Sequence, residues 1–264
     1  MSSALVRYEL RDGVALVTLD RADRLNALLP EMRDALGTHF EDAAHDPAVR
    51  AVLLQGTGRA FCAGGDVHHM LGLKRRDADF RELKPLLEYG QAIVTRIDAL
   101  AIPTIAAVNG PAAGAGINLA LACDLVIASD TARFAQVFRN IGLVPDGGAI
   151  WFLTQYLGTL RAKELVFSGR RIDAHEAHAL GLVTRVVPDA DLDTVAWQVA
   201  REYAAGPTYA LGLDKKLFKL MHQPALETLL DAEAWTQGQA LASEDHKEGL
   251  RAFREKRAPD FKGR

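Results

Sequence analysis

The sequence predicts an α/β fold in which buried strands alternate with helices. Residues 49–56, residues 102–110 and the end of the stretch 114–130 are continuously apolar and rich in β-branched residues, which is typical of strands buried on both faces. Helical patterns separate these strands, and this alternation favours a mainly parallel sheet. The chain also has 264 residues, 49% of them hydrophobic, which is enough for one large core.

A hairpin and two helices are predicted in the first hundred residues. Residues 5–10 and 14–19 alternate in polarity on either side of Asp12-Gly13, a common hairpin turn sequence. A helical pattern begins at Pro30, because proline suits the first turn of a helix. A long, highly charged helix is predicted for residues 78–100. The face of the first helix that is expected to be buried carries Met32, Leu36 and Phe40.

The C-terminal half repeats the helix-to-strand alternation and then becomes helical. In "HEAHALGLVTRVV" a helix precedes a strand, with Asp173 and Glu176 as a capping box and Gly181 as the helix stop. Beyond Pro188 no strand pattern remains. Residues 190–257 predict three or four amphipathic helices, and such a helical tail often packs on a neighbouring subunit.

Composition argues against several classes of protein. The formal net charge is -3, so no general attraction to nucleic acid or an anionic membrane is expected. No apolar run approaches the ~18 residues of a membrane span, and the N-terminus turns polar too early for a signal peptide. Cys62 and Cys123 lie in apolar stretches and cannot frame a disulfide-rich fold, so we expect a cytoplasmic protein in which Cys62 is a buried thiol.

Two glycine-rich corners follow two of the predicted strands, at residues 58–70 and 109–120. Small residues there let a ligand approach backbone N–H groups, and two such corners side by side can offer two amides to one developing oxyanion. Taken alone, each corner is better explained by close packing of helix against strand than by catalysis. Dinucleotide binding is disfavoured, because Leu119 stands where G-x-G-x-x-G requires glycine or alanine.

A single carboxylate, Asp146, interrupts the apolar stretch "NIGLVPDGGAIWF" at residues 140–152. Pro-Asp-Gly is ordinary turn chemistry, but the residue is also a candidate acid or base. An apolar environment disfavours the ionised form of a carboxyl group and so raises its pKa. The side chains expected to surround Asp146 in this way are Ile141, Leu143, Val144 and Trp151.

Five separated motifs occur in order along the chain: "AFCAGGD", "AAVNGPAAGAG", "CDLVIASDTARF", "IGLVPDGG" and "EGLRAFREKRAPDFKGR". With these motifs the chain closely resembles the crotonase (enoyl-CoA hydratase/isomerase) superfamily. The resemblance implies a spiral of ββα turns over residues 1–200 and a C-terminal helical trimerisation region over residues 201–264. It also implies a homotrimer or a hexamer and an acyl-CoA substrate. Coenzyme A is part of that substrate, so no separate cofactor is expected.

The resemblance also implies roles for individual residues. The thioester carbonyl is expected to accept hydrogen bonds from the main-chain amides of Gly65 and Ala115. The carbonyl of Ala63 is expected to meet the adenine amino group, and Arg24 to lie near the phosphates of coenzyme A. The residues expected to reach the coenzyme A of a neighbouring subunit are Phe253 and Lys256.

Hydratases of this superfamily use two glutamates, and these fall at Asn118 and Phe138 here. Neither replacement is a general acid or base at neutral pH, so simple hydration is disfavoured. In the resembling isomerases, Asp146 is the residue that transfers the proton, and one carboxylate suits isomerisation. The pattern is most similar to ring-1,2-epoxyphenylacetyl-CoA isomerases, some of which also act as Δ3,Δ2-enoyl-CoA isomerases. Asn118 is either a buried amide bonded to the backbone or a hydrogen-bonding partner of substrate or of water near Asp146.

Other interpretations remain open. On the same fold, Asp146 is the nucleophile of aryl-CoA dehalogenases, although those enzymes carry tryptophan in place of Phe138. A catalytically silent CoA-binding or RNA-binding scaffold is a third possibility, and the lack of a basic surplus argues against RNA. No metal site is expected, because "HEAH" at 175–178 lacks the spacing of H-E-x-x-H. Asp66 is expected to cap the next helix, while residues 74–84 either line the acyl pocket or form a solvated helix face.

Overall fold

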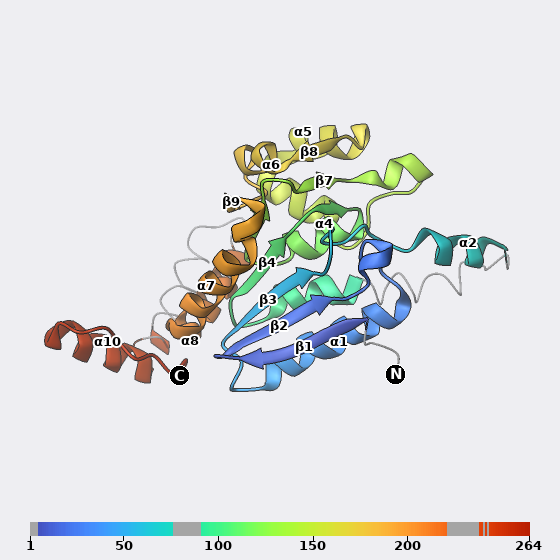
Figure 1. Ribbon diagram of the computed structural model, residues 1–264. Coiled ribbons are helices and arrows are strands. Elements are labelled where there is room, and N and C mark those ends of the chain that lie inside the picture. Colours follow the sequence, from blue (N-terminus) through green and yellow to red (C-terminus); the bar gives the residue numbers. More distant parts are fainter. Residues whose placement is uncertain (1–4, 76–90, 221–237, 240, 242) are drawn as a thin grey trace.

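A computed structural model describes residues 5–75, 91–220, 238–239, 241 and 243–264. Its centre is a six-stranded sheet (Figure 1). The first strand pairs antiparallel with the second, and every later pairing is parallel. In spatial order the strands are β1 (Val6–Arg11), β2 (Val14–Leu19), β3 (Ala51–Gly56), β4 (Thr104–Val108), β6 (Leu125–Ser129) and β9 (Arg185–Val187).

A smaller sheet runs beside the first. It contains β5 (Pro111–Ala113), β7 (Arg133–Ala135) and β8 (Arg171–Asp173), and Cys62 adds a bridge to Ala112 at its edge. The chain gives β4 to the large sheet and then β5 to the small one, and repeats this with β6 and β7. This confirms the expected crotonase-like spiral. The sequence did not predict the strands of the small sheet, because three residues are too few to show a period.

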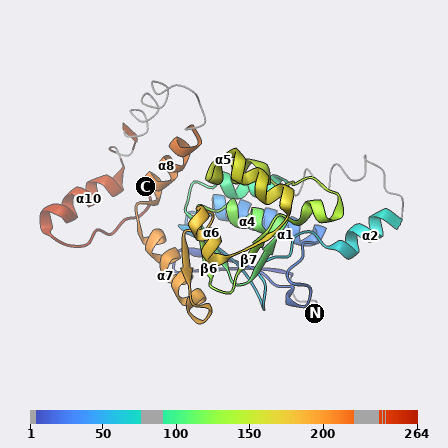
Figure 2. The ribbon, with the colours of Figure 1, turned by 90° about the horizontal axis from the view of Figure 1, so that it is seen from above.

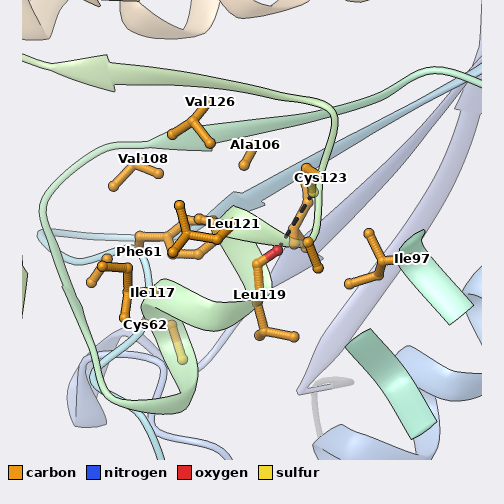
Figure 3. Close-up of a cluster of buried hydrophobic side chains, with 14 of the residues drawn as sticks. Phe61, Cys62, Ile97, Ala106, Val108, Ile117, Leu119, Leu121, Cys123 and Val126 are labelled. Atoms are coloured by element: carbon orange, nitrogen blue, oxygen red, sulfur yellow. Dashed lines mark hydrogen bonds between the residues drawn. The ribbon is translucent and has the colours of Figure 1, made fainter. Parts of the chain in front are cut away.

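Both faces of the large sheet are buried. In β3, Val52 and Leu54 belong to one hydrophobic cluster, whereas Ala51 and Leu53 belong to another. The first cluster is covered by α1 (Pro30–His45), α4 (Ala115–Leu121) and α5 (Ala149–Ser168), and the second by α7 (Leu192–Ala205). Figure 3 shows part of the first cluster, in which Ile117, Leu119 and Leu121 of α4 lie near side chains of the strands. Burial on both faces explains why these strands are continuously apolar.

The predicted hairpin and first helix are confirmed. Asp12 and Gly13 both adopt positive φ angles, 51° and 77°, which match the right-handed twist of the two strands they join. Pro30 begins α1, and the buried face of this helix includes the three predicted residues, Met32, Leu36 and Phe40. Of the charged helix predicted for residues 78–100, residues 91–99 are helical and residues 76–90 lie outside the described part.

The capping box at the start of α6 (Ala174–Leu180) is half formed. The Asp173 carboxylate accepts a hydrogen bond of 2.8 Å from the amide of Glu176. The Glu176 carboxylate, however, pairs with Arg170 at 2.7 Å and so contributes to an ion pair at the surface. Gly181 ends the helix in the left-handed conformation, as the sequence predicts.

The described residues beyond Pro188 contain helices and connecting segments. Besides α7 they form α8 (Thr208–Leu220) and α10 (Glu244–Glu255). In both views α10 lies away from the sheets, on the side of the molecule opposite α2 (Val67–Arg75) (Figures 1 and 2). Within the described residues, no helix combines the length and the apolar character needed to cross a membrane. The short 3₁₀ helices are Ala22–Arg24, Val137–Ile141 and Asp189–Asp191.

Candidate active site

The two glycine-rich corners lie side by side. The amide of Cys62 donates to the carbonyl of Pro111 at 3.2 Å, and the amide of Ala113 donates to the carbonyl of Cys62 at 2.9 Å. A Cβ atom on Gly64 would stand 2.8 Å from the carbonyl oxygen of Ala113 and 3.4 Å from the amide nitrogen of Ala115. Backbone therefore packs on backbone here, and glycine at position 64 is required by both its φ of 93° and this close approach.

The main-chain amides of Gly65 and Ala115 point away from the groups to which the residues next to them in sequence are hydrogen-bonded. Leu28 forms a parallel bridge with Gly65, in which it bonds to the carbonyl of Gly64 and the amide of Asp66. In such a bridge the amide of the central residue points away from the partner strand. Ala115 is the first residue of α4, and amides of a first helical turn have no acceptor within the helix.

Asp146 lies in the turn that precedes α5, next to the second corner. It lines a cavity of about 20 Å³, room for about one water molecule. Two other polar residues of the lining are Arg33 and Asn118. The remaining lining residues are Leu28, Gln91, Ile93, Val94, Ala115, Leu119 and Gly147. Three of the residues singled out in the sequence, Asp146, Ala115 and Asn118, thus meet at one cavity.

Burial raises the pKa of Asp146 above its ordinary value, while the positive charge of Arg33 opposes this shift. The direction agrees with the expectation from the sequence, but the expected cause is wrong. The four apolar neighbours in sequence are largely exposed in this chain: Ile141, Leu143, Val144 and Trp151 expose 57%, 48%, 81% and 53% of their surface. The apolar part of the cavity lining comes instead from α4, from residues 91–99 and from the segment before α1.

Asn118 is completely buried, and both ends of its amide are engaged. Its Nδ2 donates to the main-chain carbonyl of Asp146 at 2.9 Å, and its Oδ1 accepts from Nε2 of Gln136 at 2.8 Å. The buried-amide interpretation therefore describes its contacts, although the backbone it bonds to is that of the candidate acid. Phe138, the other hydratase position, is a buried ring 9% exposed.

Reasoning from the sequence missed Gln136 and Arg33. Gln136 follows the three-residue strand β7, and no recognised motif or periodic pattern marks it. Arg33 lies in the first turns of α1, beside the buried face of that helix. Its Nη2 lies 3.6 Å from the place of a Cβ on Gly65, so its charge is close to the first corner. In the sequence, the signal that could have identified Arg33 is its position beside the predicted buried face of the first helix.

Asp66 anchors the first corner. Its carboxylate accepts a 2.9 Å hydrogen bond from the amide of His69 at the start of α2, which confirms the predicted cap. The other oxygen accepts from Nη1 of Arg21 at 2.6 Å. Burial alone would raise the pKa of Asp66, but the hydrogen bonds from His69 and Arg21 bring it below its ordinary value.

The candidate contacts for coenzyme A fall into two places. Ala63 lies in the first corner, and its amide donates to the carbonyl of Leu25 at 3.0 Å, so the turn that carries Arg24 is tied to that corner. The Arg24 side chain is 53% exposed. Lys256 is exposed and directly follows α10, a helix that lies away from both sheets in Figure 1. The side chain of Phe253 and most of the segment 74–84 lie outside the described part.

Cys62 is a buried structural thiol, as the sequence predicts. It has no exposed surface, and burial raises its pKa to about 12. Its Sγ donates to the carbonyl of Asn26 at 3.2 Å, and its side chain belongs to the same hydrophobic cluster as Ile117 of α4 (Figure 3). A buried thiol with a raised pKa carries little thiolate at neutral pH, which makes Cys62 a poor nucleophile.

Comparisons with known proteins agree with this fold. Residues 9–264 match the family described as enoyl-CoA hydratase/isomerase. The chain is 41% identical to a Rhodobacter capsulatus protein named "Probable enoyl-CoA hydratase", with all of both chains covered. It is 38% identical to the 1,2-epoxyphenylacetyl-CoA isomerase of Escherichia coli, with 96% of each chain covered. The crystal structure of an enoyl-CoA hydratase from Bacillus anthracis superposes with a TM-score of 0.92 at 31% identity, covering 98% of this chain and 100% of that one.

The spiral of ββα turns and the likeness to these structures define a protein of the crotonase fold that processes acyl-CoA thioesters. The chain belongs to the enoyl-CoA hydratase/isomerase family.

Proposed function

We propose that this enzyme is an acyl-CoA isomerase that works through a thioester enolate. The main support is that Asp146 and Ala115 line one cavity, in which Asp146 is the sole acid among the described lining residues. One carboxylate suffices to move a proton from one carbon to another. Hydration by the mechanism of the resembling hydratases needs a second carboxylate, and Asn118 and Phe138 do not supply it.

Asp146 acts first as base and then as acid. For a 3-enoyl thioester, the carboxylate takes a proton from C2, and the electron pair of that bond forms the enolate. The negative charge on the thioester oxygen is stabilised by hydrogen bonds from the amides of Gly65 and Ala115. The carboxylic acid then returns the proton to C4 and the double bond moves to C2–C3. Atoms and charge balance, so no co-reactant is required.

The proposed acyl group is the ring epoxide of phenylacetyl-CoA or an aliphatic 3-enoyl chain. The first is supported by the 38% identity to the isomerase of Escherichia coli. The second, an aliphatic 3-enoyl chain, requires the same removal of a proton from C2 of the thioester. Coenzyme A is held by Ala63 and Arg24 of the same chain and by Phe253 and Lys256 of a neighbour.

A trimer, alone or paired into a hexamer, fits the exposed apolar surface. Around the turn of Asp146 and along α5, large apolar side chains face outward: Ile141, Leu143, Val144, Ile150, Trp151, Leu160 and Phe167. Apolar surface of this kind marks protein–protein contacts. A neighbouring subunit would cover these side chains in the cytoplasm, and so would desolvate Asp146 further.

The test is turnover of 3-hexenoyl-CoA and of the ring-epoxide thioester by the wild-type enzyme and by Asp146→Asn. We expect the variant to lose about 10²- to 10⁴-fold in kcat, because a positioned acid–base group contributes that much. Full activity of Asp146→Asn on both substrates would refute the proposed mechanism. Chloride release from a chlorobenzoyl thioester would show instead that Asp146 is a nucleophile.

Hydration is the second candidate, supported by the name of the Rhodobacter capsulatus relative. It is tested with crotonyl-CoA, whose double bond already lies at C2–C3. The proposal expects water addition much slower than isomerisation of 3-hexenoyl-CoA. Comparable rates of hydration would favour the hydratase.

A further inference from the structure

We propose that Gln136 is a positioning residue that aims Asp146 through the amide of Asn118. The inference rests on the proposed role of Asp146 and extends it to a side chain outside every motif of the sequence. The supporting contacts form one chain of two hydrogen bonds, from Gln136 Nε2 to Asn118 Oδ1 and from Asn118 Nδ2 to the carbonyl oxygen of Asp146.

These two hydrogen bonds, from Gln136 to Asn118 and from Asn118 to Asp146, are called the relay below, and the relay has a fixed direction. The main-chain carbonyl of Asp146 can only accept a hydrogen bond, so Asn118 must turn its NH₂ group toward it. The oxygen of Asn118 then faces Gln136, which must present its own NH₂ group in turn. The chemistry of one carbonyl therefore fixes the orientation of both amides.

The burial of the relay makes it stiff. Asn118 has no exposed surface and Gln136 is 3% exposed, so water cannot easily replace either partner. Within the described residues, Oε1 of Gln136 is buried without a hydrogen-bonding partner, which leaves the bond to Asn118 as the polar contact of this side chain. A buried amide with one unsatisfied oxygen is costly, and such costs are tolerated where the group has a function.

The relay holds the turn that carries Asp146, whose carboxylate must be placed precisely for proton transfer. Asp146 lies between Pro145 and Gly147, and the latter has a φ of 54°. The turn is therefore built from an unusual backbone conformation, with Asn118 Nδ2 within 3.5 Å of the place of a Cβ on Gly147. A displacement of about 1 Å at a catalytic group can cost 10²-fold in rate, so a fixed carbonyl is a direct way to aim the carboxylate beside it.

The first experiment compares Gln136→Leu with Gln55→Leu. Gln55 is a matched control, because its Nε2 donates to Thr18 Oγ1 at 3.2 Å in the large sheet. Gln136→Leu is expected to lower kcat for 3-hexenoyl-CoA by about tenfold to hundredfold with KM changed less than threefold. Gln55→Leu is expected to leave both constants within threefold. Equal, small effects of both variants on kcat would overturn the proposal.

The second experiment uses the direction of the relay. In Gln136→Glu, the new carboxyl donates a hydrogen bond when protonated and can only accept when ionised. Compared with the wild type at the same pH, the variant is expected to be about as active at low pH and to become less active as the pH rises through the pKa of that carboxyl, which burial raises. The charged groups facing the far end of the relay are Asp146 itself and Arg33, and both remain in this variant. A pH profile identical to that of the wild type would overturn the relay.

A double-mutant cycle separates this inference from the proposed function. If Gln136 acts through Asn118, then Asn118→Leu combined with Gln136→Leu has the same kcat as Asn118→Leu alone. Multiplicative losses would mean that the two residues act independently, and would overturn the relay. Asp146→Asn, measured on the same substrate, tests the proposed function by itself. A crystal structure of Gln136→Leu that shows Asp146 unmoved would also contradict the relay, whatever the activity.

Discussion

The amide of Ala113 donates a 2.9 Å hydrogen bond to the carbonyl oxygen of Cys62, and this bond joins two corners that are about 50 residues apart in sequence. The same carbonyl overlaps the place where a Cβ on Gly116 would stand. The site therefore depends on close packing of α4 against the first corner. Close packing, one of the two explanations for these glycines, is confirmed, while presentation of the amides to an oxyanion stays a prediction.

Gly116→Ala should separate the two corners. The added methyl group meets the backbone of Cys62, which cannot move without breaking its bonds to Pro111 and Ala113. We expect a loss of about 1–3 kcal/mol in the free energy of unfolding, the usual cost of overpacking, and a loss of activity. Urea denaturation measures the first. Gly72→Ala is the control, since no atom of the described residues lies within 4 Å of its Cβ position; an equal loss there would contradict this explanation.

Asp146→Asn should stabilise the fold while it removes activity. The pKa of Asp146 is raised in the folded state, so between the unfolded and folded pKa values the native chain binds more protons than the unfolded one. Stability then falls as the pH rises through this window, and the wild type stays less stable above it. The neutral variant lacks this penalty. We expect a higher Tm at neutral pH and no difference below the unfolded pKa, as measured by calorimetry across pH.

Arg33→Met should move the acid limb of the pH profile to higher pH. The charge of Arg33 favours the ionised form of Asp146 and so lowers its pKa. Proton abstraction needs the carboxylate, so in the variant kcat/KM should begin to fall at a higher pH than in the wild type. Arg33→Lys keeps the charge and should keep the limb closer to its original place. A limb that does not move in Arg33→Met would mean that this charge does not act on the catalytic group.

Cys62 should resist alkylation in the folded enzyme. Its pKa is raised from 9.0 to about 12, so at a given pH it has about a thousandfold less thiolate than an ordinary cysteine. Iodoacetamide labelling followed by peptide mapping is expected to modify Cys62 only after unfolding in urea. Rapid labelling of the native protein without loss of its folded signal would contradict the buried assignment.

Much of the fold was predictable from short sequence patterns. The hairpin at Asp12, the helix at Pro30 and the strand Ala51–Gly56 were all predictable, because turn chemistry, capping and burial act over a few neighbouring residues. The strands of the small sheet were not predictable. They are held by pairing with distant segments, and their three-residue length carries no period.

The candidate site shows the same division between features that short sequence patterns predict and features that only tertiary contacts decide. The sequence by itself singled out Asp146 and the two glycine-rich corners, because a carboxylate in an apolar stretch and glycines after strands are local signals, and the family resemblance pointed to Gly65 and Ala115 within those corners. Tertiary structure alone decided what surrounds them. It turned the apolar neighbours of Asp146 outward and placed Arg33 and Asn118 at its cavity, with Gln136 behind Asn118. The physical reason is that pKa values and hydrogen-bond directions depend on distances across the fold, which sequence spacing does not contain.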